Sequence, residues 1–504
     1  MLACVRPPLA STLRRCNQVA LAAKCGARAK ESEQSTRVLL HFNVSICYNE
    51  ADFIAEVLFR MDQLTIERQA PVIAQYDAVV CGGGPAGWVA AVSAARNGCR
   101  TALIEKMSYL GGTPTAGLVD PISGGYHKGK RVLGGVGWEF VERLVAAGAG
   151  QVELPKGHVS FDPEYYKLLA QRMVLEAGVE LYTNTVVSAC QMADGRVTHV
   201  LIESKDGLQA LAAGTVIDAT GDGFAAMRAG AQYHIGREQD GRCQPVTIEF
   251  LVDHLDESRA LSCFGGSDPV TLPDGKKYSQ LCRECCERGE LPQNVSIVRL
   301  HKTFYPGERN VNATQANGLD ILTPKDEVTA ELTLRAQIDK IIAFLRKYVP
   351  GYESCRVKSS AATLGVRETR RIEGLRRIED IDVETGTRCP DVVVHKAWFL
   401  IDIHNPAGGG QAEGHSQPAI PYDIPYGALV PRGVDGMLTA GRCISGTHRA
   451  HASYRVMAIC LATGQAAGTA AALCAKRGEL PRELDYHLVQ DALQKAGCTL
   501  FDQE

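Results

Sequence analysis

A glycine-rich turn between two short apolar strands constrains the fold of this chain more than any other feature. An apolar strand at 78–81 runs into Gly-Gly-Gly-Pro-Ala-Gly at 82–87, and a helix of small residues is predicted to follow as far as Asn97. A second apolar strand, 101–104, then ends at Glu105. A strand, a Gly-x-Gly-x-x-Gly turn, a helix and a strand ending in an acid are, in that order, typical of a dinucleotide-binding βαβ unit.

Each residue type in this unit has a physical role. Gly82 permits the tight turn, Gly84 lets a pyrophosphate approach the backbone, and Gly87 lets the helix lie close to the strand. The N-terminus of the helix offers free N–H groups and a partial positive charge to the phosphates. Glu105 stands about 20 residues further on, where a carboxylate accepts hydrogen bonds from a ribose. The sequence therefore predicts a bound dinucleotide.

Two later apolar strands also end at small residues. A hairpin is predicted at 186–203 with its turn at Asp194-Gly195, and the strand after it ends in Ala-Thr-Gly-Asp at 219–222. Near the C-terminus a strand ends at Ala440-Gly441, and a helix of small residues follows at 456–475. Together with the glycine turn, these strand ends resemble the three FAD contacts of the glutathione-reductase-like flavoprotein superfamily.

Within that superfamily the chain most resembles the FAD-dependent oxidoreductase family allied to the fumarate reductase and succinate dehydrogenase flavoproteins. The resemblance extends to the segments 110–117, 367–374, 422–431 and 441–451, and it covers about residues 70–475. It implies an α/β fold, a Rossmann-like FAD-binding domain with an inserted α+β substrate or cap domain. It leaves the substrate open, because relatives with these motifs act on diverse or unknown compounds.

The resemblance also implies which residues contact the flavin nucleotide. They are Gly82, Gly84, Pro85, Ala86, Gly87, Glu105, Lys106, Gly112, Thr113, Val186, Ala219, Thr220, Gly221, Asp222, Gly441, Arg442, Ser445 and Met457. Membrane-bound relatives attach the flavin covalently through a histidine, but residues 106–117 contain none. We therefore expect noncovalent FAD.

Reaction at flavin N5 requires a proton donor or acceptor, and cations to hold an anionic substrate or flavin. The candidates for these catalytic roles are His448, Arg367, Arg370 and Arg449. His448 is preferred as acid or base, because imidazole titrates near neutral pH and because relatives place the preceding strand end beside the flavin ring. For each candidate, a structural hydrogen bond or salt bridge is the competing interpretation.

The FAD segments divide the chain into predicted domains. Residues 61–235 and 421–480 are expected to form the FAD-binding domain, and 236–420 the substrate or cap domain. Residues 481–504 are expected to form a C-terminal helix or tail. Residues 1–60 match nothing in the family and are interpreted as a spurious or disordered extension.

Two features of the cap segment bear on its structure. Leu332, Leu334, Ile338, Ile341, Ile342 and Leu345 fall near helical spacing and predict an amphipathic helix that ends at Pro350-Gly351. Cys282, Cys285 and Cys286 have no second pair at zinc or iron–sulfur spacing, so we expect a surface helix with three thiols and no metal.

Composition restricts the partners and the compartment. A net charge of −3 gives no reason to expect nucleic acid or an anionic membrane as a partner, and the scattered cysteines favour a reducing cytoplasm. Residues 1–30 hold six basic residues and no acid, so an organelle is the alternative if they are a transit peptide. The uncharged helix at 456–475 has the length of a membrane span, but its Ala, Gly and Thr content favours a buried flavin helix.

The predicted activity is hydride transfer between a small organic substrate and flavin N5. Since the chain has one good Gly-x-Gly-x-x-Gly motif, a dedicated NADPH domain is not expected, and oxygen, a quinone or a carrier protein is expected as electron partner. A flavin-dependent monooxygenase is the main alternative. A tRNA-modifying flavoenzyme and a non-catalytic FAD-binding protein are the remaining ones, and the oligomeric state stays open.

Overall fold

The computed structural model describes residues 67–154, 157–266, 268–410, 412 and 416–502. Residues 69–504 form one compact unit, which contains the glycine turn and all three predicted FAD segments. The interpretation of residues 1–60 as an extension or transit peptide lies outside the described residues.

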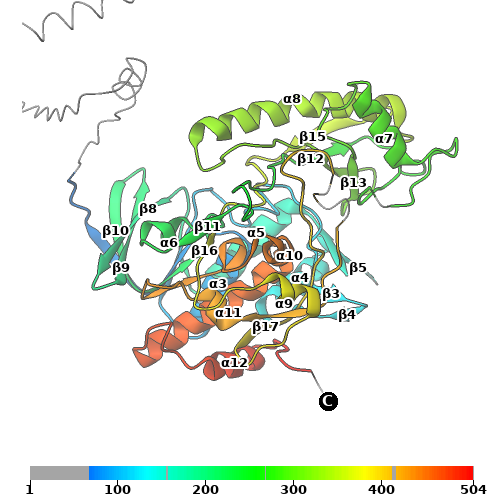
Figure 1. Ribbon diagram of the computed structural model, residues 1–504. Helices are drawn as coiled ribbons and strands as arrows, with labels where there is room; N and C mark the ends of the chain where they lie inside the picture. The colour runs from blue at the N-terminus through cyan, green and yellow to red at the C-terminus, as the bar shows by residue number, and fades with distance from the viewer. Residues whose placement is uncertain (1–66, 155–156, 267, 411, 413–415, 503–504) are drawn as a thin grey trace, which may run out of the picture. The chain divides into compact units, whose positions relative to one another are not determined.

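A seven-stranded sheet carries the glycine turn (Figure 1). Its order is β7 (Glu180–Tyr182), β2 (Thr101–Ile104), β1 (Val72–Cys81), β10 (Gly207–Asp218), β9 (Arg196–Ser204) and β8 (Val186–Ala193), and β19 (Met437–Thr439) also pairs with β10. Strands β7, β2, β1, β10 and β19 run parallel, whereas β8 and β9 form an antiparallel hairpin. Because the carboxyl ends of parallel strands meet at one edge, the three predicted FAD segments converge there.

Two helices of small residues lie side by side against this sheet, α3 (Pro85–Arg96) and α11 (Met457–Arg477) (Figure 1). A Cβ atom at Gly464 would lie 2.1 Å from the carbonyl oxygen of Ala86, and one at Gly468 would lie 2.1 Å from that of Ala90. Among the described helices, α11 alone has the length and hydropathy of a membrane span, but 89% of its most apolar window is buried inside the protein. Its glycines therefore serve helix packing in the core.

The remaining elements of the FAD-binding region surround these layers. Trp88 of α3 lies against Phe140 with the two rings tilted by 50°, and its indole N–H donates to the hydroxyl of Tyr166 at 3.2 Å. The elements are β3 (Tyr126–His127), β4 (Lys130–Arg131), α4 (Gly135–Ala146), β5 (Gly150–Glu153), β6 (His158–Phe161), α5 (Pro163–Glu176), α6 (Phe224–Arg228), β11 (Tyr233–Ile235), η1 (Tyr426–Leu429), η2 (Gly441–Cys443), α10 (His448–Tyr454) and α12 (Tyr486–Lys495).

A second core lies in the cap. Its four-stranded antiparallel sheet has the order β13 (Arg299–Lys302), β14 (Arg309–Asn312), β12 (Phe250–Asp253) and β15 (Arg356–Ser360). The helices α7 (Tyr278–Glu287) and α8 (Pro324–Tyr348) cover one face of this sheet (Figure 1). Cys282 and Cys285 of α7 are fully buried in this core, so two of the three thiols face inward rather than the surface.

The predicted amphipathic helix is α8, which ends before Pro350-Gly351. Leu334, Ile338, Ile341, Ile342 and Leu345 are buried, as the spacing predicts. Leu332 is 67% exposed, so its assignment to the apolar face was wrong. It stands two residues before Leu334, about 200° around the helix, and this separation turns it to solvent.

The chain returns from the cap to the FAD-binding region before residue 421. β16 (Arg370–Ile372) pairs with β11, and β17 (Val392–Ala397) pairs with β18 (Tyr422–Pro425). The buried residues of the second core run from Val246 to Ala361, whereas apolar residues between Ile378 and Ala419 join the core around α3 and α11. The residues that form the separate core of the cap therefore span less of the chain than the predicted cap domain, 236–420.

Candidate active site

The glycine turn has the geometry of a phosphate cradle. Gly82 has φ +100°, and a Cβ there would lie 2.6 Å from the carbonyl oxygen of Ala219. A Cβ at Gly87 would lie 1.7 Å from the carbonyl oxygen of Gly82. In contrast, a Cβ at Gly84 would meet no described atom within 4 Å. Gly84 is also the N-cap of α3 and offers no side-chain cap, so the first N–H groups of the helix face the open space.

Glu105, directly after the neighbouring strand β2, binds the backbone of the glycine turn. Its carboxylate accepts the N–H of Gly83 at 2.6 Å and that of Met107 at 2.8 Å, and the side chain is buried. An ionised carboxylate has about four lone-pair sites, so two bonds leave it able to accept from a ribose hydroxyl. The next loop lies on the same turn, since the N–H of Gly111 donates to the carbonyl oxygen of Gly83 at 2.9 Å.

Asp222 links the second and third FAD segments. Its Oδ1 atom accepts Arg442 at 2.6 Å and the hydroxyl of Thr369 at 2.8 Å. Burial raises the pKa of Asp222, but the charge of Arg442 and the bond from Thr369 outweigh it, so the pKa lies below its usual range. Asp218 holds the preceding residues in place by accepting the N–H and hydroxyl of Thr220.

Most of the other predicted FAD residues lie at this edge. A Cβ at Gly441 would lie 3.0 Å from the Cβ of Ala86, which brings the third segment against the glycine turn. Ser445 and Met457 are buried near it, Lys106 is exposed, and Val186 begins the outermost strand β8 with 47% of its surface exposed. Val186 directly follows Thr185, whose N–H donates to the carbonyl oxygen of Glu105 at 3.1 Å, so it lies beside the glycine-turn unit.

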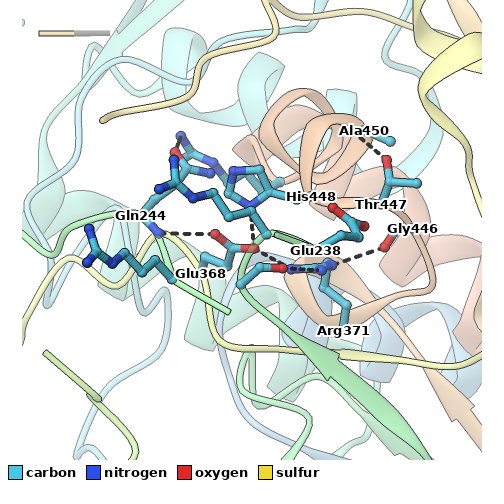
Figure 2. Close-up of polar contacts among 12 residues, drawn as sticks. Glu238, Gln244, Glu368, Arg371, Gly446, Thr447, His448 and Ala450 are labelled. Atoms are coloured by element: carbon cyan, nitrogen blue, oxygen red, sulfur yellow. Dashed lines mark hydrogen bonds and ion pairs between the residues drawn. The ribbon is translucent and has the colours of Figure 1, made fainter. Parts of the chain in front are cut away.

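His448, the preferred acid or base, is buried in an ionic cluster that Figure 2 shows. Its Nδ1 atom lies 2.8 Å from Oε1 of Glu368. Arg371 donates to the same oxygen, and the N–H of Gln244 donates to Oε2 at 3.1 Å. Arg371 also donates to the carbonyl oxygen of Gly446 at 3.0 Å. These contacts fix the position of the imidazole, and its catalytic role stays a prediction.

The predicted arginines lie in three different surroundings. Arg370 donates to the carbonyl oxygen of Asp222 at 3.2 Å and lies over the ring of Tyr233. Arg449 points to α9 (Asp380–Thr385) and pairs with Glu384 at 2.9 Å. Arg367 is buried and faces the cap. The three guanidinium groups therefore do not form one anion site.

Arg367 belongs to a polar cluster that sequence analysis missed. We name the group Arg367, Glu249, Asp402, His404, Arg455 and Gln244 the interdomain cluster. Arg367 donates to the carbonyl oxygen of Pro245 at 2.8 Å, and burial together with the charge of Arg455 lowers its pKa. Arg455 donates to the carbonyl oxygen of Asp402 at 3.0 Å, and Nε2 of His404 lies 3.4 Å from the Asp402 carboxylate.

Burial and neighbouring charges together set the pKa values of His404 and Asp402 in this cluster. It lowers the pKa of His404 to about 3, in which the charge of Arg367 assists, so the imidazole is neutral at physiological pH. Burial alone would raise the pKa of Asp402, but His404 and Arg455 hold the pKa of that carboxyl well below its usual range. At neutral pH the ionised Asp402 therefore offsets one of the two buried arginines.

Several buried polar atoms near the interdomain cluster have no hydrogen-bond partner among the described residues. They are both carboxyl oxygens of Asp120, Oε2 of Glu249, Nε2 of Gln244, Nε2 of His301, Oδ1 of Asn310 and Nε of Arg455. Buried polar atoms in native proteins nearly always have a protein or water partner. Their concentration beside the third FAD segment indicates a place for a polar ligand. No group of three metal-ligating side chains occurs in the described part of the chain.

Comparison with known families shows which family the chain belongs to. The model of the family "FAD dependent oxidoreductase" matches residues 77–493. The chain belongs to this family. It is therefore an FAD-dependent oxidoreductase.

Individual relatives are more distant. The chain is 29% identical to digeranylgeranylglycerophospholipid reductase 1 of Methanopyrus kandleri over 242 residues, 44% of this chain and 57% of that protein. It is 56% identical to dihydrolipoyl dehydrogenase of Trypanosoma brucei brucei over 43 residues, 8% of this chain and 9% of that protein. The chain thus spans less than two thirds of these relatives.

Solved structures resemble the chain at low identity. A geranylgeranyl bacteriochlorophyll reductase-like protein of Thermoplasma acidophilum is 13% identical with a TM-score of 0.42, covering 84% of this chain and 83% of that one. The flavin-dependent brominase Bmp2 is 14% identical with a TM-score of 0.43 and the same coverage. Both similarities concern the fold alone.

Proposed function

We propose that this protein transfers hydride between a small organic substrate and N5 of noncovalently bound FAD, with the substrate held between the FAD-binding region and the cap. The concentration of partnerless buried polar atoms around the interdomain cluster, all within the described residues, carries this proposal. Clefts between domains are where small ligands commonly bind. A polar substrate entering there would supply the missing hydrogen bonds.

The residues of the cradle fit FAD. The open space at Gly84 and the uncapped start of α3 suit the pyrophosphate, and Glu105 suits the ribose. FAD, when bound, supplies the two-electron chemistry of the reaction. Arg367 and Arg455 bring positive charge to the substrate side, which suits an anionic group on the substrate.

Finer assignments belong to the same proposal. We place the chain in the branch allied to the fumarate reductase and succinate dehydrogenase flavoproteins, on the strength of the segments 367–374 and 441–451. We also propose a cytoplasmic protein, or an organellar one if residues 1–30 are a transit peptide. Neither a nucleic acid nor a membrane is proposed as partner, and the electron donor or acceptor is unidentified.

Anaerobic flavin reduction tests this function. The FAD-loaded protein is mixed with NADPH, NADH and a panel of carboxylates, alcohols and amines, and the flavin absorbance is followed. We expect at least one organic compound to bleach the flavin, or to reoxidise it after chemical reduction, and NADPH to act slowly. Rapid reduction by NADPH without any panel compound would contradict the proposal and favour a flavin-dependent monooxygenase.

A further inference from the structure

The cap sheet has one apolar and one polar face. Phe250, Val311 and Leu300 lie opposite one another across β12, β14 and β13, and all three are buried in the cap core beneath α7 and α8. Because side chains alternate along a strand, Asn310 and His301 point to the other face. That face meets the FAD-binding region at the loop 118–120, which follows the predicted flavin loop.

Two contacts fix this loop against the cap. The side-chain amide of Asn310 donates to the carbonyl oxygen of Leu118 at 2.6 Å, and Nδ1 of His301 lies 3.2 Å from the carbonyl oxygen of Asp120. Leu118 has φ +53°, a left-handed conformation that is uncommon for such a side chain. Strained residues of this kind persist where their surroundings hold them, and they cluster at functional sites. Both contacts hold the backbone at Leu118 and Asp120 against the cap sheet.

Asp120 and Glu249 are buried carboxyl groups with unused acceptor atoms. Asp120 is 7% exposed, and neither of its oxygens has a hydrogen-bond partner within the described ranges. Glu249, directly before β12, is 3% exposed, and its Oε2 atom also lacks a partner there. The side-chain oxygen of Asn310 likewise has no hydrogen-bond partner among the described residues. A buried, unpaired carboxylate is costly, so such a group tends to hold a proton.

The groups around Asp120 are mostly acidic. Burial raises the pKa of Asp120 well above its usual range, and the charges of Glu249, Glu153 and Glu308 add to the effect. The backbone N–H of Phe161 lies near enough to oppose the shift, although it makes no hydrogen bond of regular geometry to the carboxyl group. Burial among acidic groups therefore favours the protonated form of Asp120.

Glu249 has mixed surroundings. Burial raises its pKa to about 8, although the charges of Arg367 and Arg299 and the side chain of Asn310 oppose the shift. The charge of Glu249 in turn raises the pKa of Asp120, so the protonation of one carboxyl group affects that of the other. The pair holds a proton within reach of physiological pH, which suits proton transfer.

We propose that Asp120 and Glu249 are the proton-transfer pair of the reaction, and that the substrate presents a polarised C=C or C=O bond to them when it is reduced. This inference rests on the proposed function. One carbon of the double bond accepts a hydride ion, which carries two electrons and one proton, from reduced FAD. The adjacent carbon or oxygen gains one proton from the pair. The π bond is lost, two bonds to hydrogen form, and the pair recovers its proton from solvent.

The reverse reaction uses the same groups. A substrate C–H bond gives hydride to oxidised FAD, while the neighbouring C–H or O–H proton passes to the deprotonated pair. Reduction is therefore favoured below about pH 8 and oxidation above it, following the titration of Glu249.

Infrared titration tests the pair without a substrate. In the full-length, FAD-loaded protein we expect the C=O stretch of a protonated carboxyl group at pH 7, with a loss of intensity around pH 8. Asp120→Asn and Glu249→Gln should each remove part of this signal. Asp423→Asn is the matched control, because Asp423 is equally buried but pairs with His395 at 2.9 Å. A wild-type spectrum without the signal, or one unchanged in both variants, would overturn the pair.

Kinetics then test its role. With a compound from the substrate panel, Asp120→Asn or Glu249→Gln should lose on the order of a hundredfold in the half-reaction between substrate and flavin. The transition near pH 8 should vanish, and FAD content should stay that of wild type and of Asp423→Asn. Unchanged rates with an intact infrared signal would overturn the proton-transfer role. If no panel compound reacts with the wild-type protein, the proposed function fails, and the infrared titration alone decides the pair.

Discussion

Nδ1 of His448 lies 2.8 Å from Oε1 of Glu368, and both side chains are buried. Arg371 bonds to the same carboxylate oxygen. This contact joins the third FAD segment to the segment 367–374, two parts of the chain that the sequence resemblance singled out separately. The contact gives His448 a structural role, whether or not His448 also takes part in catalysis.

The substitution His448→Ala separates these two roles. Glu368 would lose one buried hydrogen bond, so unfolding should become easier by about 1–3 kcal/mol in urea denaturation. FAD content should be unchanged, and the pH profile should keep its transition near about 8. If the variant instead loses about a hundredfold in rate, His448 is the acid or base and the Asp120–Glu249 assignment is wrong.

The glycine turn offers a contrast between two substitutions. Gly84→Val places its side chain in space that no described atom occupies, so the protein should fold but purify without FAD. Gly87→Val should fail to fold stably, because even a Cβ there would lie 1.7 Å from the Gly82 carbonyl oxygen. Circular dichroism and flavin absorbance measure the two effects. A yellow, stable Gly84→Val protein would contradict the placement of the pyrophosphate.

Helix α11 provides a test of its place in the core. Gly464→Leu should cost roughly 1–3 kcal/mol of stability or more, because the side chain would meet the backbone of α3 at Ala86. Lys476→Leu, at an exposed position of the same helix, is the control. Thermal unfolding compares them. Equal melting temperatures would mean that α11 does not lie against α3.

The pKa of Glu249 predicts a pH-dependent stability. Its folded value of about 8 lies above the unfolded value near about 4.3, so the folded state holds this proton more tightly. The associated stability is present below the unfolded pKa and is lost as the pH rises through about 8. Glu249→Gln removes this dependence, so its stability relative to wild type should rise between about pH 5 and 9. A constant difference across that range would contradict the buried, protonated Glu249.

These residues also show what the sequence reveals. The glycine turn and Glu105 lie within one βαβ unit, where local spacing determines geometry, and the structure places them as the motif predicts. The interdomain cluster escaped prediction because Glu249, Asp402 and Arg455 come from distant segments that tertiary folding brings together. Glu249 did leave a signal, a lone acid in the apolar run at 246–252. Arg455 left another, a charge directly before the uncharged helix at 456–475.

The release of the cofactor tests the central claim, that three distant segments build one site for noncovalent FAD. Purified protein is precipitated with acid, and the supernatant is examined by absorbance and mass spectrometry. The account predicts a yellow supernatant with the mass of FAD, close to one per chain, and a colourless pellet. A protein that purifies without flavin, or a flavin that stays with the pellet, would contradict it.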